Sequence, residues 1–189
     1  MATVTISITE SNLLTLLRTY LLALINGARA IKGQQNRVAM PNGAFVLMTS
    51  MGTKELATPE VQYTPGASNP GLQSIKRRME WKVQLDVYGG KASDGVTVLS
   101  AFDQAQILYT LVRTQYTFEV FAATGVEMQP LYADEPRNMT IVDGEAQYED
   151  RWTFDLHVQF NPVVTMSQDF AAALALELVE VDSKFPPES

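Results

Sequence analysis

Residues 79–87 read Met-Glu-Trp-Lys-Val-Gln-Leu-Asp-Val, so apolar and polar side chains alternate without a break. Successive side chains of a β-strand point to opposite faces, and this stretch therefore predicts a strand with one apolar and one hydrated face. We place it inside a longer strand from Ser74 to Tyr88, which the pair Gly89 and Gly90 ends. Strands of this kind are typical of antiparallel sheets that have a core on one side only.

A second two-sided strand is predicted from Tyr148 to Phe160. Its polar face would carry Arg151, Thr153, Asp155, His157 and Gln159, and its apolar face would carry Trp152, Phe154, Leu156, Val158 and Phe160. Pro162 has no N–H to donate, so we expect it to end the ladder. Shorter strands are expected at residues 44–48 and 116–121, whereas residues 125–142 resemble a loop.

Two main helices are predicted from apolar residues at helical spacing. The first begins at a capping box formed by Ser7 and Glu10 and ends at Gly27. The second begins at Ser93, which would cap it, and continues to about Val112.

The end of the chain is expected to contain a short helix from Ser167 to about Leu174. Residues 176–181 then form either a last strand or a longer helix. Residues 184–189 are predicted to be a polar tail.

Residues 53–71 are predicted to be an extended loop or arm, interrupted at most by a short strand at residues 60–63. The segment contains three prolines, which punctuate regular structure. Compact domains rarely carry so long a loop without a use for it. We therefore expect a partner to order this arm, through Thr58, Pro59, Tyr63 and Pro65.

The order of these elements favours an α+β fold with a largely antiparallel or mixed sheet and two main helices packed on one face. The chain has 189 residues, of which 46% are hydrophobic. That length and composition support one sizeable core, so residues 1–189 are expected to form a single domain.

The formal net charge is −7, which makes the chain a poor candidate for gripping bulk nucleic acid or an anionic membrane. The charge is unevenly distributed: residues 1–91 carry ten basic and five acidic side chains, and residues 92–189 carry four and sixteen. An electrically two-sided molecule suits head-to-tail contacts that can close into a ring. The alternative is that basic and acidic side chains are mixed on the surface of the folded chain, which their order in the sequence cannot exclude.

The chain has no cysteine and one histidine. This composition excludes disulfides, thiolate zinc sites, cysteine nucleophiles and multi-histidine metal sites, and we expect neither a metal nor a cofactor. The start lacks a basic region, and the apolar run of residues 13–25 is too short to span a bilayer. A soluble cytoplasmic product is therefore expected, without a membrane partner.

No catalytic arrangement emerges from the residues. His157 is expected on the hydrated face of its strand, with Asp155 as its neighbour, where a solvated role is far more common than a catalytic one. Glu149 and Asp150 are adjacent on a strand and would point apart, so they could not converge on one substrate. The residues favour a binding or assembly module; a small acidic enzyme with an unrecognised site is the alternative from another class.

Six short segments lie in order between about residue 10 and residue 182: Gln35–Pro41, Phe45–Thr49, Trp81–Gly89, Pro130–Arg137, Gly144–Trp152 and Gln159–Thr165. Each is weak alone. Their order and spacing together resemble the neck or tail terminator proteins of long-tailed bacteriophages.

The resemblance implies a structural virion protein that forms a hexameric ring at the head-proximal end of the tail tube. Such a ring ends tube polymerisation and provides the head–tail joining surface. Its partners would be the tail tube protein and a head-completion or connector protein, and genome DNA would pass through its lumen without sequence readout. It would be assembled in the host cytoplasm. The alternative is another head–tail connector, such as a stopper or adaptor, or a minor tail protein of the neck.

The basic cluster Lys76, Arg77 and Arg78 lacks interleaved aromatic residues, which favours a protein interface over phosphate contacts. Our hypothesis is that this cluster meets the segment from Glu149 to Arg151 on the next subunit of the ring. Its acidic members, Glu149 and Asp150, would supply the opposite charges.

Overall fold

The alternation in residues 79–87 is realised in a strand that extends from Gly71 to Tyr88 and forms the middle of the sheet. The computed structural model describes residues 3–25, 29–33, 43–66, 70–89, 99–142 and 148–168. Its helices are α1 (Glu10–Leu24), α2 (Ala101–Leu111) and α3 (Gln115–Ala122). Its strands are β1 (Val4–Ile6), β2 (Arg29–Lys32), β3 (Phe45–Thr64), β4 (Gly71–Tyr88), β5 (Met128–Ala133), β6 (Arg137–Asn138), β7 (Ile141–Val142), β8 (Tyr148–Glu149), β9 (Arg151–Phe160) and β10 (Val163–Gln168).

Eight of these strands form one sheet, in which the pair β2 and β3 is parallel and the other pairs are antiparallel. On one side β4 pairs with β3 along nearly its whole length. On the other side it pairs with β10 at residues 71–76 and with β9 at residues 79–88. The α+β fold expected from the sequence is confirmed.

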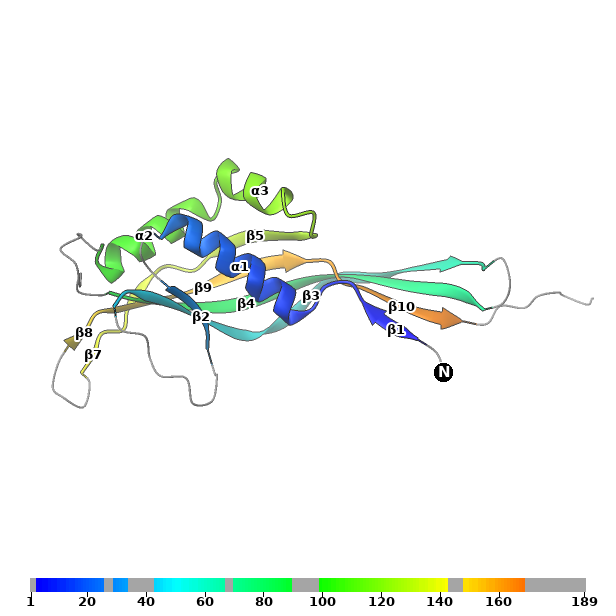
Figure 1. Cartoon of the computed structure of the whole chain (residues 1–189), viewed down its shortest axis with the longest axis horizontal. Coiled ribbons are helices and arrows are strands. Elements are labelled where there is room, and N and C mark those ends of the chain that lie inside the picture. The colour runs from blue at the N-terminus through cyan, green and yellow to red at the C-terminus, as the bar shows by residue number, and fades with distance from the viewer. Residues whose placement is uncertain are drawn as a thin grey trace, which may run out of the picture.

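The core lies between one face of this sheet and the helices. Trp81, Val83 and Leu85 of β4 are buried there, with Phe154 and Leu156 of β9 beside them. Figure 1 shows the helices over one part of the sheet and the rest of the sheet extending away from them. We call the helix-covered part the body.

We call the extending part the arm; it consists of residues 53–64 of β3, residues 71–78 of β4, β10 and β1 (Figure 1). The prediction that residues 53–71 form a loop is wrong for residues 53–64, which belong to β3. The turn-forming residues are accommodated by register shifts between Ser50 and Gly52 and on both sides of Ala57. Pro59 is tolerated because this part of β3 lies at an edge of the described sheet.

Two further predictions are wrong because each concerns a segment of only about six residues, in which the pattern of apolar residues does not distinguish helix, strand and loop. Residues 116–121 form α3 instead of a strand, with Thr117 and Phe121 buried one helical turn apart. Residues 128–133, expected to be loop, form β5 at the side of β9. A register shift between Pro130 and Tyr132 lets the proline sit in that strand.

The predicted strand ends and helix caps are shifted. Pro162 ends β9, but the chain re-enters the sheet as β10, because β4 extends far enough to pair with both. Ser167 lies in β10 and does not begin a helix. Residues 169–174 of that predicted helix, and the segments expected at residues 176–181 and 184–189, lie outside the described residues.

α1 is capped by Thr9, whose hydroxyl accepts from the Asn12 N–H at 3.3 Å, and not by Ser7. Ser100 caps α2 by accepting from the Asp103 N–H at 3.1 Å. Gly27 and Ser93, the predicted helix end and cap, lie outside the described residues.

Candidate functional site

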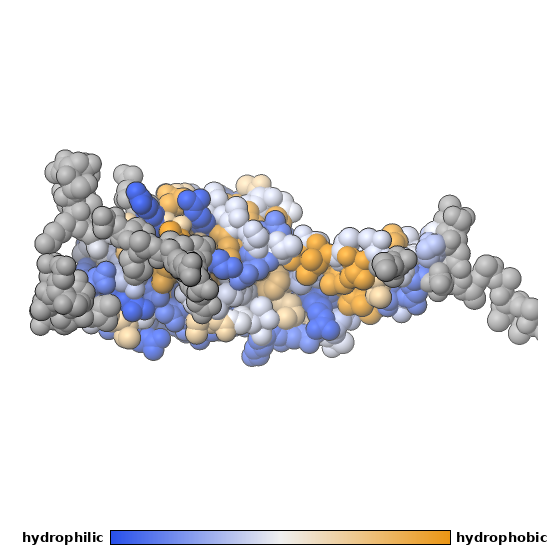
Figure 2. Space-filling model, turned by 60° about the horizontal axis from the view of Figure 1, so that its bottom comes forward, coloured by the Kyte–Doolittle hydropathy of each residue, from blue (hydrophilic) through white to orange (hydrophobic). Residues whose placement is uncertain are grey.

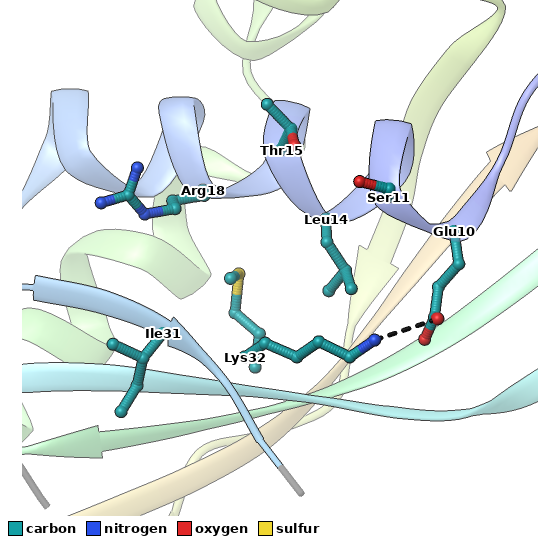
Figure 3. A pocket seen from close by; sticks show the side chains of 8 residues that line it. Glu10, Ser11, Leu14, Thr15, Arg18, Ile31 and Lys32 are labelled. Atoms are coloured by element: carbon teal, nitrogen blue, oxygen red, sulfur yellow. Dashed lines mark hydrogen bonds and ion pairs between the residues drawn. The ribbon is translucent and has the colours of Figure 1, made fainter. Parts of the chain in front are cut away.

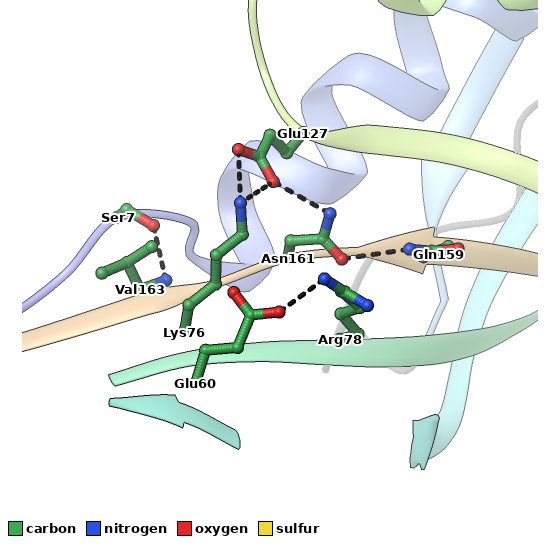
Figure 4. Close-up of polar contacts among 8 residues, drawn as sticks. All are labelled: Ser7, Glu60, Lys76, Arg78, Glu127, Gln159, Asn161 and Val163. Carbon is green, nitrogen blue, oxygen red and sulfur yellow. Dashed lines mark hydrogen bonds and ion pairs between the residues drawn. The ribbon is translucent and has the colours of Figure 1, made fainter. Parts of the chain in front are cut away.

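The basic cluster lies on the arm, and the strand divides it between two faces. Lys76 and Arg78 lie on one face of β4, which we call the polar arm face, and Arg77 lies on the other. On the polar arm face the Lys76 ammonium lies 2.7 Å from Glu127, and Arg78 lies 2.5 Å from Glu60. Figure 4 shows both contacts.

Arg77 lies 3.9 Å from Glu55, so each cation of the cluster has an acidic partner in its own chain. The side chains of these pairs are between 33% and 58% exposed. Exposed ion pairs contribute at most about 1 kcal/mol each, because water and salt screen them. The pairs are therefore weak enough for a partner to replace them.

Glu127 connects the arm to the body. Besides Lys76, it accepts a hydrogen bond from the Asn161 amide at 2.9 Å, and Asn161 in turn accepts from Gln159 at 3.2 Å (Figure 4). The hydrogen bond from Lys76, followed by that from Asn161, lowers the pKa of Glu127 below its ordinary value. These contacts fix the position where β9 gives way to β10.

The segment from Glu149 to Arg151 lies at the other end of the sheet. Asp150 accepts the Ala101 N–H at 2.9 Å, at the N-terminus of α2, where a carboxylate also suits the helix dipole. Arg151 lies 2.9 Å from Asp86 and 5.4 Å from the centre of the Tyr88 ring. Glu149 is half-buried in β8.

The two predicted clusters do not meet within one chain. Arg151 pairs with Tyr88, which is twelve residues beyond Lys76 on β4. At about 3.3 Å per residue, that separation is about 40 Å. The structure thus places the cationic and the acidic segments toward opposite ends of the sheet.

The hydrated face expected for His157 is wrong: its side chain is only 9% exposed. Its Nδ1 lies 2.6 Å from the Glu80 carboxylate, and its ring stacks on Tyr132 at a centroid distance of 4.1 Å. Asp155, the predicted neighbour, instead contacts Lys82 at 2.8 Å. The burial follows from β5, which the sequence did not reveal and which supplies Tyr132.

Asp86 is a further polar residue that the sequence pattern did not single out. It is 2% exposed and binds both Arg151 and the Gln84 amide, the latter at 3.0 Å to each carboxylate oxygen. In the sequence it is simply one of the alternating polar residues of its strand. Only the pairing of β4 with β9 shows that it is buried beside a cation.

An open hollow of about 360 Å³ lies between α1 and β2, next to Met48 of β3. Figure 3 shows the ion pair between Lys32 and Glu10, whose charged atoms are 3.0 Å apart. Arg18, which also lines the hollow, donates a hydrogen bond to the Ala30 carbonyl at 3.0 Å. The hydroxyls of Ser11 and Thr15 also line it, without a histidine beside them among the lining residues. This arrangement ties α1 to β2.

In the described part of the chain, no group of three or more His, Cys, Asp or Glu side chains could hold a metal ion. None of the described helices is long and apolar enough to cross a membrane.

In a comparison with known protein families, a family model described as phage neck terminator protein matches residues 11–186. The matched range contains α2, α3, α1 except for Glu10, and every described strand except β1. Comparison with curated proteins finds no match.

Proposed function

The chain belongs to the phage neck terminator family, and we propose that it forms a hexameric ring at the head-proximal end of the tail tube. There it would end tube polymerisation and provide the surface that joins head and tail. The family is one of structural proteins of the phage neck, so the chain is a virion component of that region. The observation that carries the proposal is the family match over residues 11–186.

The proposed ring contact is head-to-tail. The cationic cluster and the acidic segment lie about 40 Å apart along β4. The arm of one copy can therefore contact the acidic end of the next copy, while its own acidic end contacts the arm of a third. Different patches that meet in this way generate a ring when the rotation between copies closes. In this arrangement Lys76, Arg77 and Arg78 would exchange their weak internal partners for Glu149 and Asp150 of the next copy, beside Arg151.

The proposed mechanism is steric and requires neither catalysis nor a cofactor. One face of the ring binds the last layer of tube protein, and the other face differs from it, so a further tube subunit finds no matching surface. A head-completion or connector protein would then bind the outward face. DNA would pass through the lumen without sequence readout, because an acidic protein repels the phosphates.

We also propose that a partner binds this end of the sheet through Thr58, Pro59, Tyr63 and Pro65 and further stabilises the strand pairing that is present in the single chain. Hydrogen exchange tests this point with and without tail tubes. The amides of residue 58 and residues 60–64 should exchange at least about ten-fold more slowly when the ring is on the tube, because bound edge strands are protected. Equal protection in the isolated monomer would contradict it.

The experiment for the main proposal uses tubes assembled from purified tail tube protein. Electron microscopy should show six-fold rings on one tube end, and tubes so capped should stop lengthening when fresh tube protein is added. Tubes that continue to grow would contradict the terminator function. Binding to the portal side of the neck without binding to tubes would instead indicate an adaptor or stopper.

A further inference from the structure

The imidazole of His157 lies between two carboxylates that come from different segments of the chain. Its Nδ1 lies 2.6 Å from the carboxylate of Glu80 on β4, and its Nε2 lies 3.5 Å from the carboxylate of Asp134, the residue that follows β5. The histidine side chain is 9% exposed, so water has little access to it. Both ring nitrogens therefore face acidic groups in a nearly closed site.

The two contacts of the ring are unequal. The distance to Glu80 is that of a short hydrogen bond, whereas 3.5 Å is beyond the usual limit of about 3.2 Å for an N–H···O bond. Nε2 is buried and has no hydrogen-bond partner in the described part of the chain. A buried polar atom without a partner costs free energy. The fold thus satisfies one nitrogen of the ring and leaves the other facing a carboxylate that it does not bind.

The number of protons on the ring decides how many carboxylates it can bind. A neutral imidazole has one N–H and an imidazolium has two. The neutral ring can donate to Glu80 through Nδ1, and its Nε2 then directs a lone pair toward Asp134. The imidazolium can donate to both carboxylates, and hydrogen bonds between charged groups are shorter and stronger than neutral ones. One proton therefore separates a ring held on one side from a ring held on both.

Other charged and titratable side chains surround the ring. Lys82 lies opposite His157 in the register of β4 and β9, and Asp155 holds it at 2.8 Å. Tyr132 of β5 stacks on the imidazole. The nearby groups beyond these are Lys54, which is opposite Glu80 on β3, Arg113, which is 5.8 Å from the centre of the Tyr132 ring, and Arg137 of β6, whose charge acts on Lys82. Of all these side-chain types, histidine is the one that ordinarily changes charge between about pH 5 and 8.

Asp134 begins the connection of residues 134–136 that joins β5 to β6. Both strands pair with β9, so the connection lies beside the strand that carries His157. The Asp134 N–H donates to the Asp155 carbonyl at 2.8 Å, whereas the Asp134 side chain is 46% exposed. The backbone of this residue is therefore fixed by the sheet, and its carboxylate is available for a further bond.

We propose that His157 is a proton-dependent lock on the connection between β5 and β6. When Nε2 carries a proton, it binds Asp134 and fastens the connection to β9 and, through Glu80, to β4. When Nε2 carries no proton, the Asp134 carboxylate is released to solvent. The inference concerns the single chain, so it stands or falls independently of ring formation and tube capping.

Residue-resolved hydrogen exchange at about pH 5.5 and about pH 8 tests the lock, with each rate divided by the intrinsic rate at that pH. Protection of the Asp134 amide should be about five-fold or more higher in acid, because opening must then also break the bond from Nε2. The Met139 amide, which donates to the Arg151 carbonyl at 2.8 Å further along β9, should change by less than about two-fold. Equal protection of the Asp134 amide at both pH values, or an equal rise at Met139, would overturn the inference.

Two matched variants separate the lock from other effects of pH. Asp134→Ala removes the carboxylate but keeps the backbone bond to Asp155, so protection at position 134 should change with pH by less than about two-fold. Glu135→Ala removes the neighbouring, exposed carboxylate and should respond to pH as the wild type does. A response that persists in Asp134→Ala, or that is lost in Glu135→Ala, would overturn the inference.

A second measurement observes the imidazole directly. Because the chain has one histidine, nitrogen NMR detects the two ring nitrogens of His157 without ambiguity. Once the ring is neutral, its proton should be on Nδ1. In acid, the Nε2 proton should exchange with water about five-fold or more slowly in the wild type than in Asp134→Ala. A neutral ring with its proton on Nε2, or equal exchange of the Nε2 proton in both proteins, would overturn the inference.

Discussion

Val83 and Leu85 in the body are 0% and 1% exposed, whereas Val61 on the same face of the arm is 49% exposed. The same two strands, β3 and β4, run through both regions, with a similar alternation of side chains. What differs is the layer of described helices, which covers the body and stops before the arm (Figure 1). The comparison teaches that one strand pattern can build a core in one place and, among the described residues, a face with exposed apolar side chains in another (Figure 2).

Substitutions in the core of the body should cause the largest loss of stability. Trp81→Ala removes a ring that is 1% exposed and donates to Ser50 at 2.8 Å, and we expect it to lower the free energy of unfolding by about 3–5 kcal/mol. Ile75→Ala, on the same face of the same strand but half-buried on the arm, should cost about 1 kcal/mol or less. Urea denaturation measures both. Equal losses would show that the arm is as well packed as the body.

The polar face of the body should be the next most sensitive region. Asp86→Ala leaves the Arg151 guanidinium without its partner and should lower the free energy of unfolding by about 3 kcal/mol. The matched arm variant Glu60→Ala removes the exposed partner of Arg78 and should cost less than about 1 kcal/mol. Thermal unfolding of both variants checks the contrast, which a comparable loss in Glu60→Ala would contradict.

A smaller loss of stability is expected at the contact between α1 and α3. The Thr117 hydroxyl lies 2.8 Å from that of Tyr20 and donates to the Leu111 carbonyl at 2.7 Å. Thr117→Val keeps the shape but leaves the buried Tyr20 hydroxyl without this partner, at a cost of about 1–3 kcal/mol. Burial already raises the pKa of Tyr20. Denaturant unfolding measures the loss, and an unchanged midpoint would mean that water replaces the threonine.

The smallest effect concerns the junction between body and arm. Lys76 lowers the pKa of Glu127 from its ordinary value of 4.5, so this carboxylate stabilises the fold above that pH and the contribution is lost as the pH falls through the folded-state pKa. Glu127→Gln should therefore cost less than about 1 kcal/mol at neutral pH, since the side chain is exposed. The difference from wild type should shrink in acid. A difference that is constant with pH would show that charge plays no part there.

The strands that were predicted correctly are those whose pattern is long and local. The alternation around Trp81 and around Phe154 spans many residues, so each strand and its apolar face could be identified without knowledge of a partner. Residues 116–121 are too few to decide between strand and helix, because apolar residues in a hexapeptide can also line one side of a helix of fewer than two turns. Thr117 and Phe121 became helical neighbours through their contacts with Tyr20.

The candidate site was only partly predictable for the same reason. The basic cluster and the acidic segment were visible in the sequence, but the division of Lys76 and Arg77 between two faces follows from the strand that carries them. The burial of His157 beside Glu80 and Tyr132 depends on β5 pairing with β9. Such contacts join residues that are far apart in the chain, and no local pattern records them.

The sequence by itself determined the α+β class, the two-sided strands, the uneven charge and the resemblance to phage terminators. These follow from periodicity, composition and motif order, which are local or additive properties of the chain. Only the tertiary structure decided that residues 53–64 are a strand, that one long strand serves both body and arm, and that the described helices cover only the body part of the sheet. Those features depend on which strands pair and where the helix layer ends, and pairing energies arise only when distant segments meet.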